Sequence, residues 1–599
     1  MCGVAGYITS SNVDKSVLKE MTKVLHHRGP DGSGHFYSSG VALGHTRLSI
    51  VDLSNAGHQP MSYMDRYVIT YNGEVYNYTE IRQELEVLGY LFNSDTDTEV
   101  ILAAFDKWGV ECLSKFNGMW AFVIYDKKDK IFFISRDRFG IKPLYYYRES
   151  NDFVFASEIK SILVNPLVKN MPNELYLEQY LLKGPKEYYT ETAFESIFRF
   201  PVSSYFLGSA EELNDDFKIN QFWTFNSNLK EELFSEEKAK KYAETYYEIL
   251  SDAVRLRLRA DVRVGSALSG GLDSSSIVYL VNQYLKSLGK TELQETFSSV
   301  YKAEGTTDCD ESEFIDLVAK SLNVNSHQIE PKVEDLPFKH KQVIYHMENP
   351  PEGTCMSAWH TFQLVKETGV KVTLDGQGAD EQLAGYLDYV MTYLVSLKLL
   401  DFYKEFKYFI KIPGIKKRII LSGMMVHFKA IFGKKVLKKC IKRLKGLDFY
   451  TNLNEQLEES TKHNLVNLIH YADHTSMAHS IESRMPFMDY RLIEFLSSVP
   501  ATYKMHNGWT KYIARLAFDG KLPDEIVWRK DKMGWPIPEK FWFLGPLKAW
   551  IEKKIPEEIN LEEKINKHGV RFLIRKLNLK VFKELYFSRQ ETKTKNKHV

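Results

Sequence analysis

The chain has 599 residues, with 79 basic and 78 acidic side chains and a formal net charge of +1. A hydrophobic content of 44% and a charged content of 26% are typical of folded globular proteins, so the composition excludes a wholly disordered or collagen-like chain. The balanced charge argues against a nucleic-acid partner, and the length predicts about two to four domains.

The first 200 or so residues are predicted to be rich in β-strands. Short apolar or alternating runs at 68–71, 119–125, 131–135 and 152–156 are separated by Gly, Asn and Asp. Helical periodicity appears at 13–25 and 78–88. The polar stretch at 208–230 indicates the approach to a domain boundary.

The pattern changes from about residue 235. A long helix at 236–258 leads into a buried strand at 262–268, a glycine turn and another helix, and further strands are expected at 295–300 and 371–374. Alternating strands and helices predict a parallel α/β sheet. The polar residues 588–599 are expected to be frayed.

The cysteines and the amino terminus indicate a cytoplasmic protein. The five cysteines are widely spaced and form no CxxC pair, so neither a disulfide framework nor a structural zinc site is expected. No basic segment precedes an apolar stretch at the amino terminus, so a signal peptide is not expected. The uncharged stretch at 419–428 is shorter than the roughly 18–20 residues of a spanning helix.

Cys2 is a candidate nucleophile. Removal of Met1 would place its thiol beside a free α-amino group, whose pKa of about 7.7–8.0 makes it a general base near neutral pH. Taken alone, a cysteine at this position usually has no role. Four further segments follow in order: HHRGPDG at 26–32, GHTRLSIVD at 44–52, YNGEVYN at 71–77 and SDTDTE at 94–99. We expect the third to be a strand ending in an Asn-Gly turn, and the fourth to open a helix with an N-cap.

Together these segments resemble the glutaminase domain of class II, N-terminal nucleophile glutamine amidotransferases, over about residues 2–205. The resemblance implies an αββα sandwich in which Cys2 attacks the side-chain amide of glutamine and releases ammonia. It implies that Arg47 holds the α-carboxylate of glutamine, while Glu74 and Asp97 hold its α-ammonium group. The side chain of Asn72 and the N–H of Gly73 would form the oxyanion hole.

A second motif, SGGLDSSS at 269–276, joins a predicted strand to a predicted helix. Glycines allow a tight turn around an anion, and the helix amino terminus supplies N–H groups, but no GKS/T follows, so this is not a Walker A loop. Asp273 among the serines indicates a divalent metal. The loop DGQGADE at 375–381 follows another strand, where Asp380 could share Mg²⁺ with Asp273.

These loops resemble the ATP-pyrophosphatase site of asparagine synthetases, and the resemblance continues through IESRMPFMD at 481–489 and WTKY at 509–512. It implies a Rossmann-like domain in which a carboxylate attacks the α-phosphorus of ATP, pyrophosphate leaves, and ammonia converts the acyl-adenylate to an amide. Asp273 and Asp380 would bind Mg²⁺, and Lys511 would stabilise charge near the adenylate. The pyrophosphate and nucleotide would contact Leu268, Ser269, Gly270, Gly271, Leu272, Asp273, Ser274, Ser299, Asp375 and Gly376.

Two departures from the family pattern bear on the acceptor acid. Gln377 stands where asparagine synthetases commonly carry a glutamate, and an amide cannot accept a proton from attacking ammonia. Met356 falls where some members hold aspartate, and its side chain cannot pair with a carboxylate. The resemblance implies aspartate as the acceptor, and these two departures motivate the alternative, a sugar uronate of polysaccharide assembly.

A basic segment interrupts the second half. Residues 398–445 hold fifteen Lys and Arg against Asp401 and Glu405, with aromatic and aliphatic residues between them. Solvated helices packed on the domain are the simpler interpretation. The alternative is contact with an anionic membrane surface or a phosphate-bearing substrate.

The sequence thus predicts a glutaminase domain at 2–207 and an ATP-dependent synthetase domain at 235–585. The expected small-molecule partners are glutamine, ATP with Mg²⁺, and aspartate or another acid. Because dimers are common in the family, the resemblance also suggests a homodimer. A non-catalytic nitrogen sensor is disfavoured by the intact site residues, and a sugar-phosphate aminotransferase by the SGGLDSSS loop.

Overall fold

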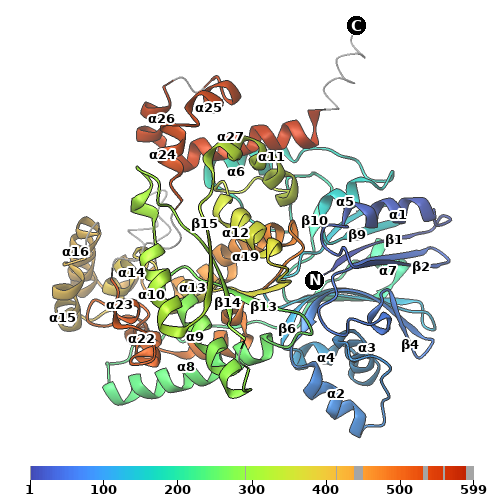
Figure 1. Cartoon of the computed structure of the whole chain (residues 1–599), viewed down its shortest axis with the longest axis horizontal. Helices are drawn as coiled ribbons and strands as arrows, with labels where there is room; N and C mark the ends of the chain where they lie inside the picture. The colour runs from blue at the N-terminus through green and yellow to red at the C-terminus, as the bar shows by residue number, and fades with distance from the viewer. Residues whose placement is uncertain are drawn as a thin grey trace.

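The computed structural model describes residues 2–290, 292–412, 415–437, 450–530, 537–557 and 560–588. Two antiparallel six-stranded sheets form the amino-terminal half, and a parallel five-stranded sheet forms the centre of the second half (Figure 1). The predicted fraying at 588–599 falls almost wholly outside the described residues, since only Ser588 is included.

The two antiparallel sheets pack face to face. The first has the order β10-β8-β9-β1-β3-β2 and the second the order β12-β11-β7-β6-β5-β4. Apolar side chains from both sheets, including Val4, Leu43, Val68 and Val123, form the core between them. The strands are β1 (Gly3–Thr9), β2 (Gly32–Ser38), β3 (Val41–Arg47), β4 (Met61–Tyr63), β5 (Tyr67–Val75), β6 (Gly118–Asp126), β7 (Ile131–Arg136), β8 (Tyr145–Glu149), β9 (Asp152–Ala156), β10 (Ile197–Arg199), β11 (Ser204–Ser209) and β12 (Asn220–Gln221).

Helices cover the outer faces of both sheets, which gives the predicted αββα sandwich. Helices α1 (Lys15–Val24) and α5 (Ile159–Leu163) lie on the first sheet, while α2 (Tyr78–Val87) and α3 (Asp97–Trp108) cover the second. The four predicted strands and both predicted helices of this half are confirmed. So is the N-cap, because the Thr96 side chain accepts from Glu99 N–H at the start of α3.

The prediction of an Asn-Gly turn was wrong. Asn72 and Gly73 lie inside β5, paired with Ala121 and Trp120 of β6, and the ladder continues to Val75. A Cβ on residue 73 would lie 2.1 Å from the Met119 carbonyl oxygen. The glycine here allows close approach of two strands, which a sequence pattern alone does not distinguish from a turn.

The second half contains the predicted parallel sheet, with the order β15-β14-β13-β16-β17. Its strands are β13 (Val264–Ala267), β14 (Glu295–Ser299), β15 (Asn325–Ile329), β16 (Val372–Leu374) and β17 (Glu482–Arg484). The predicted long helix is α8 (Glu236–Arg257), and α9 (Leu272–Ser287) follows the glycine turn. Short parallel strands buried by helices on both faces are typical of nucleotide-binding α/β domains.

Further helices complete this half. They are α10 (Ser312–Leu322), α11 (Leu336–Met347), α12 (Met356–Glu367), α13 (Ala379–Leu383), α14 (Asp388–Ser396), α15 (Leu399–Phe409), α16 (Lys416–Phe432), α18 (Leu453–Glu459), α19 (Leu465–Met477), α20 (Tyr490–Ser498), α21 (Ala501–Lys504), α22 (Tyr512–Phe518), α23 (Asp524–Val527), α24 (Glu539–Leu544), α25 (Lys548–Lys554), α26 (Leu561–His568) and α27 (Val570–Tyr586). Within the described residues, no helix has the length and apolarity needed to cross a membrane.

The two halves share hydrophobic cores. One core joins Leu48 and Met119 of the amino-terminal half to Val372 of β16 and to Met485, which follows β17. Another joins α1 and α5 to α11, α12 and α27. In Figure 1, α27 lies across α6 (Glu174–Lys183) and α11. Shared cores of this kind hold the two halves in a fixed arrangement.

Candidate active sites

Cys2 and Asn72 meet at the edge of the two sheets of the sandwich. Cys2 directly precedes β1, and its backbone N–H donates to Asn72 Oδ1 at 3.1 Å. The Asn72 side chain is fully buried, and its Nδ2 has no hydrogen-bond partner. Burial raises the pKa of the Cys2 thiol, so the thiol needs an adjacent base to become a nucleophile at neutral pH. A free amide donor beside a thiol is the arrangement expected of an oxyanion hole.

Arg47 ends β3 and is fixed by the loop that follows it. Its Nη1 donates to the Ser54 carbonyl at 2.7 Å, and its Nη2 donates to the Asp52 carbonyl. The guanidinium group lies against Gly57, where a Cβ would come within 2.1 Å of Nη2. The loop therefore holds a planar cation in one orientation without neutralising it.

Glu74 and Asp97 form an acidic pair in the same site. Asp97 Oδ2 accepts from the Tyr71 hydroxyl at 2.7 Å and from Val75 N–H at 2.8 Å. Burial raises the pKa of Asp97 to about 6. Burial, together with the charges of Asp97 and Glu482, raises the pKa of Glu74 well above its ordinary value. Two carboxylates perturbed in this way favour binding of a cation such as an α-ammonium group.

The second half contributes two residues that the sequence reasoning missed. Glu482 and Arg484 on β17 are fully buried, and Arg484 Nε donates to Glu482 Oε1 at 2.5 Å. Arg484 Nη2 lies 3.6 Å from Glu74 Oε1, which brings a cation of the parallel sheet to the acidic pair of the sandwich. The alternating Glu-Ser-Arg pattern within the segment at 481–489 was the signal that could have indicated them.

The SGGLDSSS loop joins β13 to α9 as predicted. Gly270 has φ +68°, and Gly271 begins α9 without a side-chain cap. Ser274 closes the loop, because its Oγ accepts from Ser269 N–H at 3.1 Å and lies 3.0 Å from Ser269 Oγ. Uncapped N–H groups at a helix amino terminus, flanked by hydroxyls, form a binding site for phosphate.

Lys511 lies between Asp273 and Asp380. Its Nζ donates to Asp273 Oδ2 at 2.5 Å and forms an ion pair with Asp380 Oδ1. Although burial opposes the charged form, these two carboxylates raise the pKa of Lys511. Gly385 leaves room for the arrangement, since a Cβ there would lie 1.8 Å from Asp380 Oδ1.

The two carboxylates also fit a magnesium ion. Asp273 Oδ1 is buried and has no hydrogen-bond partner. Asp273 and Asp380 follow the adjacent strands β13 and β16, so both lie at the carboxyl edge of the sheet. Mg²⁺ usually takes one or two protein carboxylates and completes its shell with phosphate and water.

The remaining predicted nucleotide contacts lie at the same sheet edge. Gly376 packs on the first turn of α9, where a Cβ would lie 3.4 Å from Ser274 N. Burial raises the pKa of Asp375 to about 6, and Ser483 donates a hydrogen bond to its Oδ2. Ser299 Oγ lies 2.8 Å from Thr361 Oγ1 of α12, and Leu268 N–H pairs with the Phe297 carbonyl.

Met356 does not line either site. It is fully buried at the start of α12 and packs in the core with Trp359 and Trp542. Its position therefore carries no information about an acceptor acid. Gln377, by contrast, lies between Gly376 and the Gly378 that precedes α13, in the loop next to Asp273.

Comparison with known proteins finds a family match for each half of the chain. Residues 1–223 match the family described as glutamine amidotransferase domain, and residues 245–593 match the one described as asparagine synthase. The chain belongs to the asparagine synthetase family. Glutamine-dependent amidation is therefore its type of reaction.

Three relatives span most of the chain. Asparagine synthetase [glutamine-hydrolyzing] 1 of Bacillus subtilis is 32% identical over 93% of this chain and 90% of its own length. Putative asparagine synthetase [glutamine-hydrolyzing] 2 of Methanocaldococcus jannaschii is 33% identical over 69% and 80%. Amidase chry2 of Gibberella zeae is 28% identical over 93% and 91%.

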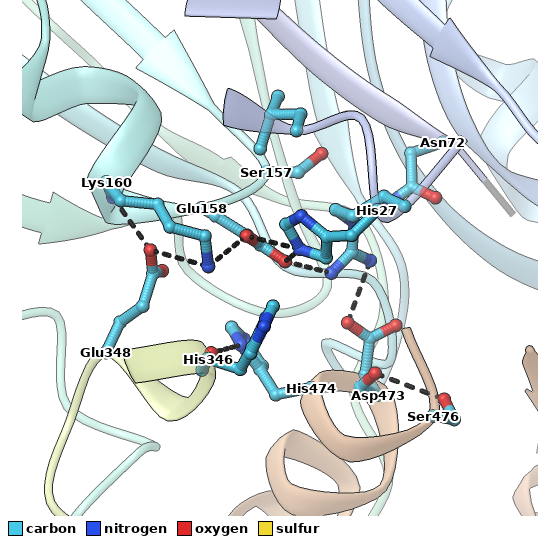
Figure 2. A network of polar contacts seen from close by, with 12 residues as sticks. His27, Asn72, Ser157, Glu158, Lys160, His346, Glu348, Asp473, His474 and Ser476 are labelled. Carbon is cyan, nitrogen blue, oxygen red and sulfur yellow. Dashed lines mark hydrogen bonds and ion pairs between the residues drawn. The ribbon is translucent and has the colours of Figure 1, made fainter. Parts of the chain in front are cut away.

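In this member of the asparagine synthetase family, a buried polar network connects the two halves. Figure 2 shows Glu158 beside His27 and Lys160, with Glu348 of the second half beyond Lys160. Arg28 donates to Glu158 Oε1 at 2.8 Å, to Asp473 Oδ2 of α19 at 2.9 Å and to the Cys2 carbonyl at 3.2 Å. One guanidinium group thus links the backbone of Cys2 to both halves.

Proposed function

We propose that this chain is a glutamine-hydrolysing asparagine synthetase. It would amidate aspartate with ammonia from glutamine, through a β-aspartyl-AMP intermediate, giving AMP, pyrophosphate and glutamate. The observation that carries the proposal is β17, because Glu482 and Arg484 reach the glutaminase pocket while Ser483 contacts Asp375 of the nucleotide site. Two reaction sites sharing one strand suit a reaction in which one site supplies the other.

In the glutaminase site, Cys2 would attack the side-chain carbonyl of glutamine. With Met1 removed, the Cys2 nitrogen becomes the α-amine that accepts the thiol proton and later donates it to the departing ammonia. Asn72 Nδ2 and the N–H of Gly73 would stabilise the tetrahedral oxyanion. Arg47 would bind the α-carboxylate, and Glu74 with Asp97 the α-ammonium group.

In the synthetase site, the loop from Ser269 to Ser274 would hold the pyrophosphate portion of ATP. Leu268, Ser299, Asp375 and Gly376 would surround the nucleotide. Asp273 and Asp380 would hold Mg²⁺, which neutralises phosphate charge when bound. Lys511 would stabilise the negative charge that develops as the acid's carboxylate attacks the α-phosphorus.

The alternative keeps the same chemistry but changes the acid, for example to a sugar uronate in the biosynthesis of a surface polysaccharide. Gln377 motivates it, because asparagine synthetases commonly carry a glutamate at this position of the loop. One relative is named an amidase rather than an asparagine synthetase, which also supports the alternative.

One experiment separates these proposals. Purified protein is incubated with ATP, Mg²⁺ and glutamine, and pyrophosphate release is recorded with aspartate, with glucuronate or galacturonate, and without acid. Aspartate-dependent pyrophosphate together with asparagine supports the main proposal. Release only with a uronate would replace it with the alternative, and no release with any acid would contradict both.

A further inference from the structure

The outward side of α15 and α16 combines exposed apolar side chains with lysines. These helices lie at the edge of the second half that faces away from the sandwich (Figure 1). Leu400 is 77% exposed, Ile431 73% and Met424 67%. Ile420, Phe432 and Tyr403 are also more than half exposed. We call these six residues, together with the exposed Lys407, Lys411, Lys416, Lys417, Lys434 and Lys435, the outer face.

Helix α16 is apolar on two sides, and the part of the chain that the structure describes covers only one of them. Ile419 and Val426 are fully buried against Phe402 and Tyr393. Ile420, Met424 and Ile431 follow at spacings of four and seven residues, so they form a second stripe directed at solvent. A helix that is apolar all round is normally covered on all sides. The second stripe is therefore a surface that lacks its partner.

The two helices present one continuous surface. The Tyr403 hydroxyl lies 2.7 Å from His427 Nε2, which joins the outer side of α15 to that of α16. Leu400 lies one turn before Lys404 and two turns before Lys407 on the same side of α15. The exposed apolar side chains of the two helices therefore adjoin.

The outer face carries an uncompensated positive charge. Lys407, Lys411, Lys416, Lys417, Lys434 and Lys435 are exposed and form no ion pair with any described residue. Of the two acidic residues of the segment, Asp401 pairs with Lys404, which is not among these six lysines, and Glu405 is buried beside His506. Lys438, Lys439, Lys442, Arg443 and Lys445 lie outside the described residues.

The combination of exposed apolar side chains and positive charge favours one kind of binding partner for the outer face. A second copy of this chain would place the same lysines opposite one another, and the repulsion would oppose a symmetric contact. Nucleic acid matches the charge but not the exposed aliphatic side chains. An anionic lipid surface matches both, because aliphatic side chains enter the headgroup boundary while lysines contact lipid phosphates.

We propose that α15 and α16 form a peripheral membrane-binding surface that lies on anionic lipid, with the outer face toward the bilayer. The helices would lie in the plane of the interface rather than cross it. The surface consists of residues outside both reaction sites, so the proposal is independent of the acceptor acid.

Vesicle sedimentation tests the proposal. The full chain is mixed with vesicles of phosphatidylcholine, or of equal parts phosphatidylcholine and phosphatidylglycerol, at increasing NaCl concentrations. We expect binding to the anionic vesicles only, weakening with salt. Substitution of Ile420, Met424 and Ile431 by Asn should lower the partition coefficient about tenfold or more. Val87→Asn with Leu91→Asn, exposed on the sandwich, is the matched control.

A charge-reversal set tests the electrostatic part. Changing Lys407, Lys417 and Lys434 to Glu should lower the partition coefficient by about a hundredfold, whereas Glu at Lys19, Lys128 and Lys240 should have much less effect. Equal binding to neutral and anionic vesicles would overturn the proposal. So would unchanged binding of the apolar triple variant. If light scattering showed that the wild type is a dimer and the apolar triple variant a monomer, the outer face would be assigned to contact with a second copy instead.

Discussion

The two polar atoms of the Asn72 side chain differ in their hydrogen bonding. Oδ1 accepts from Cys2 N–H, whereas Nδ2 is buried without a partner. We predict that Asn72→Ala lowers kcat for glutamine hydrolysis by about 10²–10³, because one oxyanion donor is lost. Glutamate release by the pure variant measures this. Pyrophosphate release driven by added ammonium should stay close to that of the wild type, and a matching loss there would show that the substitution acts through the fold.

The acidic pair predicts how the glutaminase depends on pH. Asp97 has a pKa raised to about 6 and Glu74 is raised as well, so the pair loses negative charge as the pH falls through 6. Since the charged forms would bind the α-ammonium group, kcat/KM for glutamine should fall below pH 6 and level off above the pKa values of the pair. Ammonium-driven synthesis over the same range is the control for other ionisations. A glutamine profile that stays flat down to pH 5 would contradict this assignment.

Lys511 makes a prediction for the other site. Lys511→Met should lower pyrophosphate release by about 10² or more, because the cation that pairs with both Asp273 and Asp380 is lost. Glutamine hydrolysis measured without ATP should remain. Lys521→Met, an exposed lysine on the turn after α22, is the matched control. Equal activity of the two variants would exclude a role for Lys511 in the reaction.

At the scale of single elements, alternation along β17 directs Arg484 to Glu74 and Ser483 to Asp375. Arg484→Gln should raise KM for glutamine, since Glu74 loses its nearby cation and binds a proton more readily. Ser483→Ala removes a donor to Asp375 on the opposite side, so it should slow pyrophosphate release and leave KM for glutamine within about twofold. If both variants raised KM for glutamine and slowed pyrophosphate release to the same extent, the result would contradict this assignment of the two sides of β17.

Elements were predictable where the pattern is local. The alternation at 152–156, the helix at 236–257 and the N-cap at Thr96 depend on neighbouring residues, and the structure has each of them. Strand β17 has three residues with no apolar periodicity, and only its pairing with β16 defines it. Gly73 was misread for the same reason, because the close approach of β6 is a tertiary contact.

The candidate sites show the same limit. The motifs identified Cys2, Asn72 and the SGGLDSSS loop, and the fold brings each set together. Glu482 and Arg484 lie more than 400 positions from Glu74 in the sequence, and no spacing rule connects them. For α16, the sequence showed only that basic and apolar residues are interleaved. It could not show which apolar residues are exposed, because the burial of Ile419 and the exposure of Ile420 depend on packing against α14 and α15.

At the scale of the whole molecule, the two halves form one unit. Their cores are shared, and Arg28 contacts Glu158 in the sandwich and Asp473 in the second half while holding the Cys2 carbonyl. Removing one partner of a buried ion pair typically costs about 3–5 kcal/mol. The Arg28 contacts therefore stabilise the packing of the two halves against each other.

The central claim is that glutamine hydrolysis at Cys2 supplies a separate ATP-dependent site. The most direct test compares wild type and Cys2→Ala for pyrophosphate release with ATP, Mg²⁺ and the acceptor acid, using glutamine or ammonium as nitrogen donor. We predict that the variant loses glutamine-driven amide formation completely and keeps the ammonium-driven reaction. Loss of both reactions in a folded variant, or survival of the glutamine-driven one, would contradict the claim.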